Sequence, residues 1–193
     1  MGDAVKGGPR RNRDASGGVQ VGDFEARALF EALDRQRLER ALTWRQVAQS
    51  IWAQSSELND RRHDHPIAVE TITGMWRRDN ISCQHALFMP RWLGRAPEEF
   101  IPHPVEGSAG VGLPVVGPDR RPRWNLAALY EALDACRREQ GLTWRSLAGL
   151  LGCTQNQLTG IKRARFGIGM RLAMRITQWL ARPASKFIYA ARW

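Results

Sequence analysis

The chain has 193 residues, an apolar share of 43% and a formal net charge of +10, most of it from arginine. This length allows one large domain or two small ones, and the charge favours nucleic acid or an anionic membrane face as a partner. Three cysteines without a C-x-x-C pair argue against a disulfide framework, and no apolar run suits a leader peptide or a membrane span. We therefore expect a soluble cytoplasmic protein that has no membrane partner.

Part of the sequence is duplicated. The block A-L-F-E-A-L-D at 28–34 recurs 100 residues later as A-L-Y-E-A-L-D, and L-T-W-R at 42–45 recurs at the same offset. Farther on, R-W-L-G-R at 91–95 returns 87 residues later as Q-W-L-A-R. The offset shortens because the first copy has about a dozen extra residues between its second and third helices. Matched blocks in one order indicate an internal repeat.

Four segments follow from this duplication. Residues 1–22 are polar and rich in glycine with a basic cluster, so we expect a disordered basic arm. The first repeat covers 23–101 and the second covers 124–193. Residues 102–123 are rich in proline and glycine and indicate a linker, whose r.m.s. span as a flexible coil would be roughly 25 Å.

The positive charge is concentrated in the second repeat. The first repeat has 11 basic and 12 acidic residues and a net charge of −1, whereas the second has 11 basic and 3 acidic residues and a net charge of +8. A general preference for arginine would have loaded both repeats alike. The difference therefore indicates a polyanionic partner for the second repeat.

Both repeats have the apolar spacing of helices. In the second repeat, apolar side chains recur at intervals of three and four residues: Leu126, Leu129, Tyr130, Leu133 and Cys136. Shorter helices are predicted over 144–151, 155–163 and about 168–181, the first two capped by Thr143 and Thr154. Because period-two alternation is scarce, we predict an all-α fold.

Two short helices joined by a tight turn with glycine form a helix-turn-helix unit, whose second helix can lie in the major groove of DNA. The sequence at 142–163, L-T-W-R-S-L-A-G-L-L-G-C-T-Q-N-Q-L-T-G-I-K-R, resembles the Cro/repressor-type family, also called XRE-like or lambda-repressor-like. The resemblance rests on the turn at 151–154 and on the apolar residues around it: Leu147, Ala148, Leu158 and Ile161. It covers each repeat nearly whole and implies two tandem helix-turn-helix domains.

The resemblance also implies roles for individual residues. Gln155 begins the recognition helix, where family members often place a glutamine, and its amide can donate and accept at the N6/N7 edge of adenine. Asn156 and Thr159 are expected on or near the same face. The residues expected to contact phosphate are Thr143, Trp144, Thr154, Lys162, Arg163 and Arg165. For Trp144 the alternative is packing in place of donation from the indole N–H.

The first repeat departs from this pattern. Its second helix is predicted to continue through I-W-A-Q-S-S-E-L-N at 51–59, followed by a polar loop and a third helix that starts near Pro66. Val69 and Glu70 align with the first two residues of the recognition helix, and a glutamate is unsuited to a groove lined with phosphates. We therefore predict that this repeat has lost or altered direct DNA reading and supports the other as a packing or dimerisation partner.

No cofactor and no catalytic residues are predicted, because no nucleophile–base pair or phosphate-binding glycine loop is visible. One metal alternative exists in the first repeat, a four-ligand zinc site built from His63, His65, Cys83 and His85. The other interpretation of these residues is a hydrogen-bonding loop followed by the start of a helix.

The sequence thus predicts a protein that binds double-stranded DNA sequence-specifically, a bacterial or phage transcriptional regulator associated with the nucleoid. The family usually reads two half-sites as a dimer, so the partner is a second chain or the other repeat of the same chain. The alternative is an adaptor or antitoxin-like module, with Trp52 and Trp76 of the first repeat as candidate protein contacts. RNA in place of DNA stays open.

Overall fold

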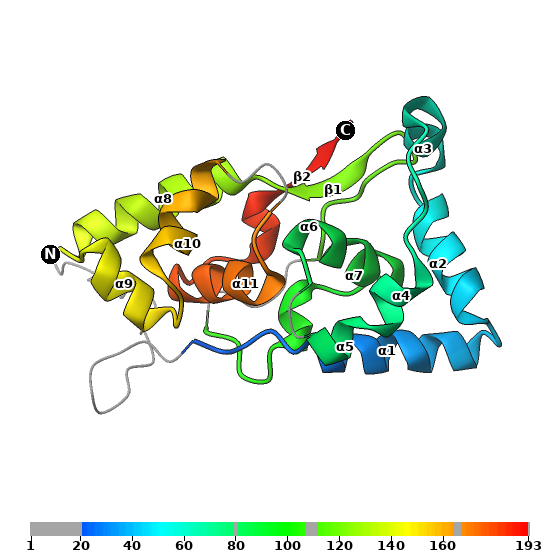
Figure 1. The fold of residues 1–193 in the computed structure, drawn as a ribbon, viewed down its shortest axis with the longest axis horizontal. Coiled ribbons are helices and arrows are strands. Elements are labelled where there is room, and N and C mark those ends of the chain that lie inside the picture. The colour runs from blue at the N-terminus through cyan, green and yellow to red at the C-terminus, as the bar shows by residue number, and fades with distance from the viewer. Residues whose placement is uncertain (1–20, 79–80, 107–111, 164–166, 193) are drawn as a thin grey trace, which may run out of the picture.

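The computed structural model of the chain describes residues 21–78, 81–106, 112–163 and 167–192. Nearly all of the expected N-terminal arm, Arg165 and the side chain of Trp76 lie outside the described residues. The described chain is mostly helical, as predicted, with one two-stranded sheet that was not predicted (Figure 1). None of its helices has both the length and the hydropathy that a membrane crossing requires.

The elements follow the duplicated sequence. The first repeat contains α1 (Ala26–Glu39), α2 (Trp44–Ala53), α3 (Ser56–Arg62), α4 (Val69–Thr73), α5 (Met75–Arg78), α6 (Cys83–Ala86), α7 (Phe88–Leu93) and the 3-10 helix η1 (Pro97–Phe100). The remainder contains β1 (Arg121–Trp124), α8 (Leu126–Glu139), α9 (Trp144–Leu150), α10 (Gln155–Gly160), the 3-10 helix η2 (Ile161–Arg163), α11 (Met170–Trp179), the 3-10 helix η3 (Ala184–Phe187) and β2 (Ile188–Ala191).

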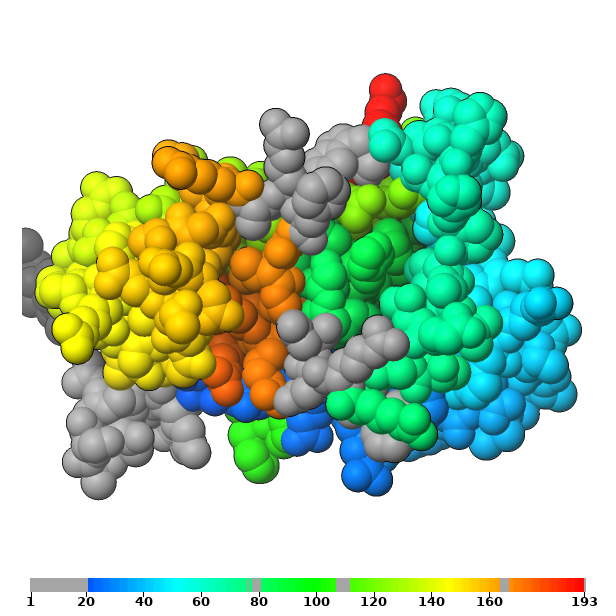
Figure 2. Space-filling view, viewed as in Figure 1, coloured from blue at the N-terminus to red at the C-terminus, as the bar shows by residue number. Residues whose placement is uncertain are grey.

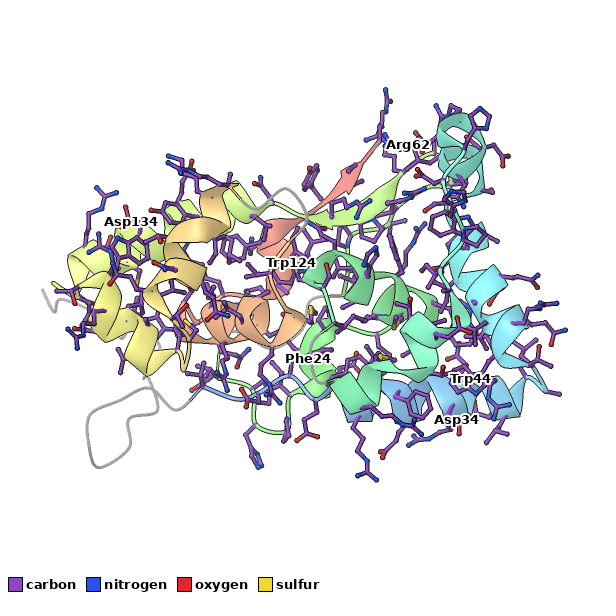
Figure 3. The ribbon with its side chains drawn as sticks, viewed as in Figure 1. Phe24, Asp34, Trp44, Arg62, Trp124 and Asp134 are labelled. Carbon is purple, nitrogen blue, oxygen red and sulfur yellow. The ribbon has the colours of Figure 1, made fainter. Side chains whose placement is uncertain are left out.

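The two repeats have the same local structure where their sequences match. Trp44 stacks on Phe30 with 5.2 Å between ring centroids, and Trp144 stacks on Tyr130 at 5.5 Å. The Arg37 guanidinium lies over the Trp44 ring and forms an ion pair with Asp34. In the second repeat, Arg137 makes the same contacts with Trp144 and Asp134; Figure 3 labels Asp34, Trp44 and Asp134. The same set of contacts therefore joins the first helix to the second in both copies.

The structure corrects the prediction for the residues inserted in the first repeat. The second helix does not continue through 51–59 but ends at Ala53, and a separate helix, α3, extends into the first half of the expected polar loop and ends at Arg62. The helix is interrupted there because a polar side chain binds a distant part of the chain: the Ser55 hydroxyl donates to the Arg120 carbonyl at 2.7 Å. The third helix begins at Val69 and not near Pro66.

Equivalent segments of the two repeats contact each other. Ser82 and Gly169, which are 87 residues apart, form an antiparallel bridge. On either side of it, the Cys83 amide donates to the Ile168 carbonyl and the Met170 amide to the Ile81 carbonyl, each at 2.8 Å. Because the paired positions are equivalent, the repeats are related by an approximate two-fold axis. Figure 1 shows the result, with α8 and α1 at opposite margins and α11 and α6 at the centre.

A single apolar core runs through both repeats, so they form one packed body in the described chain. Gly167 lies at their contact with φ of +91°, and a Cβ there would be 3.1 Å from the Cys83 sulfur. Phe24 and Trp124, again 100 residues apart, are both buried near this contact (Figure 3). The repeats are therefore joined by packing as well as by sequence.

The described parts of the linker differ from the flexible coil expected for 102–123. Val105 is buried, and its amide donates to the side-chain oxygen of Gln178. The Pro118 carbonyl accepts from the Leu58 amide at 3.1 Å, which ties the later part of the segment to α3. The last residues form β1, which pairs antiparallel with β2 in a register that sets Arg121 opposite Ala191 and Trp124 opposite Ile188.

Candidate nucleic-acid interface

Residues 143–163 form two short helices joined by a tight turn. The Thr143 hydroxyl oxygen accepts from the Ser146 amide at 3.1 Å and so caps α9, as predicted. After α9, Gly152 has φ of +60°, a left-handed conformation that glycine adopts without strain. The Cys153 amide then donates to the Ala148 carbonyl at 3.0 Å. The chain reverses there, and α10 packs on α9.

Helix α10 begins with a reciprocal cap. The Thr154 hydroxyl oxygen accepts from the Gln157 amide at 3.2 Å, and the Gln157 side-chain oxygen accepts from the Thr154 amide at 2.8 Å. The side chain of Gln157 is therefore engaged in the cap. Sequence reasoning overlooked Gln157, although the T-x-x-Q spacing of a capping box was visible.

The outer face of α10 presents amide side chains. Gln155 and Asn156 are exposed, whereas Leu158 faces the core and is fully buried. Thr159 is half-buried, and its hydroxyl donates to the Gln155 carbonyl at 3.2 Å, so this hydroxyl already has a partner within the helix. Of the three predicted base contacts, Gln155 and Asn156 thus have side chains that face solvent.

Two exposed cations, Lys162 and Arg163, lie in η2, which directly follows α10. The last of the predicted phosphate contacts, Arg165, lies outside the described residues. From Gln140 to the end of the chain there are nine lysine and arginine residues and no aspartate or glutamate. In Figure 2 the yellow and orange segment that contains α10 and η2 lies at the surface at one end of the molecule.

Trp144 occupies a packed position. It is half-buried, lies nearly parallel to the Tyr130 ring at an interplanar angle of 16°, and has the Arg137 guanidinium 4.6 Å from its ring centroid. Trp44 has the same surroundings in the first repeat, which has no glutamine at the position equivalent to Gln155. The stack therefore supports the packing interpretation of Trp144.

A residue that the sequence reasoning missed, Arg175, links the turn to the first repeat. Its guanidinium donates to the Leu151 carbonyl at 2.9 Å and to the Gly152 carbonyl at 3.3 Å. The same group forms an ion pair with Asp23, with 3.0 Å between Nη2 and Oδ2. The hydrogen bond from Arg175 lowers the pKa of the Asp23 carboxyl and outweighs burial, which acts in the opposite direction. No local sequence pattern marks this contact, because its partners are 152 residues apart.

The equivalent surface of the first repeat is different. At the start of α4, Val69 is half-buried and Glu70 is exposed. In sequence, α3 and the following loop lie between α2 and α4, although these two helices contact each other. An exposed carboxylate therefore takes the place of an exposed amide. Direct contact with phosphate is unfavourable at this position.

The zinc alternative is not formed in the described chain, where no three histidine, cysteine or acidic side chains come together as metal ligands. Cys83 is fully buried, and burial raises the pKa of its thiol to about 12, so the thiolate that zinc binds is disfavoured. His63 is the residue that follows α3, and its backbone is left-handed.

Comparison with protein-family models, curated proteins and solved structures gives no match for this chain.

Proposed function

We propose that the chain binds double-stranded DNA sequence-specifically as a tandem helix-turn-helix protein of Cro/repressor type, a bacterial or phage transcriptional regulator. The observation that carries the proposal is the surface of α10. It places the exposed side chains of Gln155 and Asn156 on a capped helix, followed at once by Lys162 and Arg163. Amides that read base edges, flanked by cations that bind phosphate, are what a recognition helix requires.

In this proposal the cap and the amides have separate roles. Thr154 and Gln157 hold the first turn of α10, so the helix does not have to become ordered on binding. The side-chain N–H of Gln155 is then free to donate to N7 of one adenine, while its side-chain carbonyl oxygen accepts from the N6 amino group of the same base. Lys162 and Arg163 neutralise phosphates, which contributes affinity but no sequence preference.

The two-fold arrangement of the repeats resembles the pairing by which such proteins read two half-sites. The first repeat presents Glu70 where the second presents Asn156, so the proposed site is asymmetric. One half-site is read by α10 and the other half contributes little sequence preference. A second copy of the chain is then not needed to complete a binding unit.

Gel retardation with a salt titration tests this proposal. The wild-type chain should retain duplex DNA with an affinity that falls steeply with salt, and Lys162→Gln should flatten the slope by about one unit. Arg27→Gln is the matched control, because Arg27 is equally a cation, lies on α1 of the first repeat and has a side chain 77% exposed. No retention at low salt, or equal effects of the two substitutions, would contradict the proposal. Competition between duplex DNA and RNA decides which nucleic acid is bound.

The adaptor alternative has weaker support. Trp52 is half-buried, packs edge-on against Phe88 and has the Arg121 guanidinium 4.7 Å from its ring centroid. Its ring is therefore largely used inside the protein and offers little surface to a partner.

A further inference from the structure

The residues inserted in the first repeat help to form a cavity. The second repeat has no residues equivalent to this insertion. The cavity has a volume of about 540 Å³ and lies between α2, the end of α3 with its following loop, α4, the α6–α7 segment and β1. In the second repeat a four-residue turn joins the equivalent helices. Cavities for small molecules usually measure about 300–1,000 Å³, so this one is large enough for a ligand.

Three guanidinium groups line the cavity, Arg62, Arg121 and Arg123, against one carboxylate, Asp64. Asp64 binds both Arg121, at 2.7 Å, and Arg62, at 3.3 Å. The walls therefore carry two positive charges in excess. Figure 3 shows Arg62 where the end of α3 approaches β1, although the two are about sixty residues apart in sequence.

The excess charge is partly withdrawn from water. The Arg121 side chain is only 5% exposed, and although it also binds the Asn59 oxygen at 2.7 Å, its Nε has no hydrogen-bond partner. Burial lowers the pKa of Arg123, and the charges of Arg121 and Arg62 lower it further. A cluster of cations that repel one another in a half-enclosed space is stabilised by an anion.

The cavity also contains planar apolar surface. Phe88 lies at its wall, with Trp52 edge-on at 6.5 Å and the Arg123 guanidinium 5.7 Å from its ring centroid. His85 adds a third ring, and burial together with the charge of Arg123 lowers its pKa. Flat guanidinium and aromatic groups accommodate a planar ligand better than a compact ion.

We propose that this cavity binds a small organic anion in which a planar ring is joined to a phosphate or carboxylate group. Arg62 and Arg123 bind the anionic group, while Asp64 holds Arg121 in position behind them. The exposed His85 contacts the ring, and the largely buried Phe88 forms the wall behind it. The proposal does not depend on DNA binding by α10, because none of the residues involved belongs to the second-repeat helices.

Isothermal titration calorimetry of the full chain with adenosine monophosphate and with salicylate shows whether the cavity prefers a phosphate or a carboxylate as the anionic group. At least one probe should bind saturably with a Kd below about 100 μM, and adenosine and inorganic phosphate should bind at least about tenfold more weakly. Arg62→Gln should weaken the bound probe about tenfold or more, because it removes a charge-assisted bidentate contact. Arg61→Gln is the control: Arg61 is the neighbouring cation on α3, its side chain is 58% exposed, and it does not line the cavity.

A second variant tests the cavity itself without changing its charge. Ala68 lines the cavity and is exposed at the start of α4, so Ala68→Trp should fill the space and abolish binding while thermal unfolding stays cooperative. Equal loss with Arg61→Gln and Arg62→Gln, or no loss with Ala68→Trp, would overturn the proposal. It would also be overturned if both probes had a Kd above about 1 mM, or if duplex DNA displaced a bound probe. Gel retardation by the same samples shows separately whether α10 binds DNA.

Discussion

Replacing Asp23 by asparagine tests how the first repeat is held against the turn between α9 and α10. The substitution removes the charge that Arg175 binds and that Arg171 approaches to 3.9 Å. Hydrogen bonds to charged groups are worth about 1.5–3 kcal/mol when buried, but the Asp23 side chain is 39% exposed and solvent screens the pair. We therefore expect the free energy of unfolding to fall by about 1–2 kcal/mol at pH 7.

The lowered pKa of Asp23 also determines how this loss of stability depends on pH. Because the folded protein lowers the pKa of Asp23, the stabilisation is present above the ordinary aspartate pKa of about 4 and disappears as the pH falls through the lower folded value. Urea unfolding should therefore separate variant and wild type at pH 7, and the difference should shrink as the pH is lowered below the ordinary aspartate pKa. Glu31→Gln, in an exposed pair on α1, should cost at most about 0.5 kcal/mol. An Asp23→Asn effect no larger than this, or one that persists in acid, would refute the reasoning.

Two further predictions concern the cap and the cysteines. Thr154→Ala should lower the free energy of unfolding by about 1 kcal/mol and also weaken DNA binding. Thr43→Ala, which removes the same kind of cap from α2, should lower the stability as much without changing the affinity for DNA. Urea unfolding and gel retardation measure the two effects, and equal DNA affinities of the two variants would count against α10. In native protein at pH 8, Ellman's reagent should modify the half-buried Cys136 first and Cys153 more slowly, because burial raises the pKa of Cys153. Cys83 should react only after unfolding, because it is buried and its pKa is raised to about 12. Fast reaction of all three cysteines would contradict the burial of Cys83.

The local elements could be predicted because their signals are local. The stripe at Leu126, Leu129 and Leu133 is buried in α8, and Thr143 and Thr154 cap the helices that they were expected to cap. The break after Ala53 was not predictable, since it depends on Arg120, which contacts Ser55 from 65 residues away. An apolar pattern indicates which face of a helix is buried, but not where a distant carbonyl will recruit a hydroxyl.

The contact between the repeats was invisible for the same reason. It uses main-chain groups of Ile81 and Ile168, and backbone amides carry no sequence signature. β1 has the sequence R-P-R-W, without alternation, and forms a strand only because β2 pairs with it from the end of the chain. Within the candidate interface, the exposure of Gln155 was expected from the resemblance of residues 142–163 to the Cro/repressor-type family, whereas the contact of Arg175 with Asp23 required the fold.

Selection of bound sequences from a random duplex library tests most directly whether α10 reads DNA. The wild-type chain should enrich one short motif, and Glu70→Ala should enrich the same motif, since Glu70 lies on the repeat that is expected not to read bases. Gln155→Ala should relax the preference at one position of the motif, at a cost of about 1–3 kcal/mol on the selected site. An unchanged motif with Gln155→Ala, or a motif altered by Glu70→Ala, would show that α10 is not the reading helix.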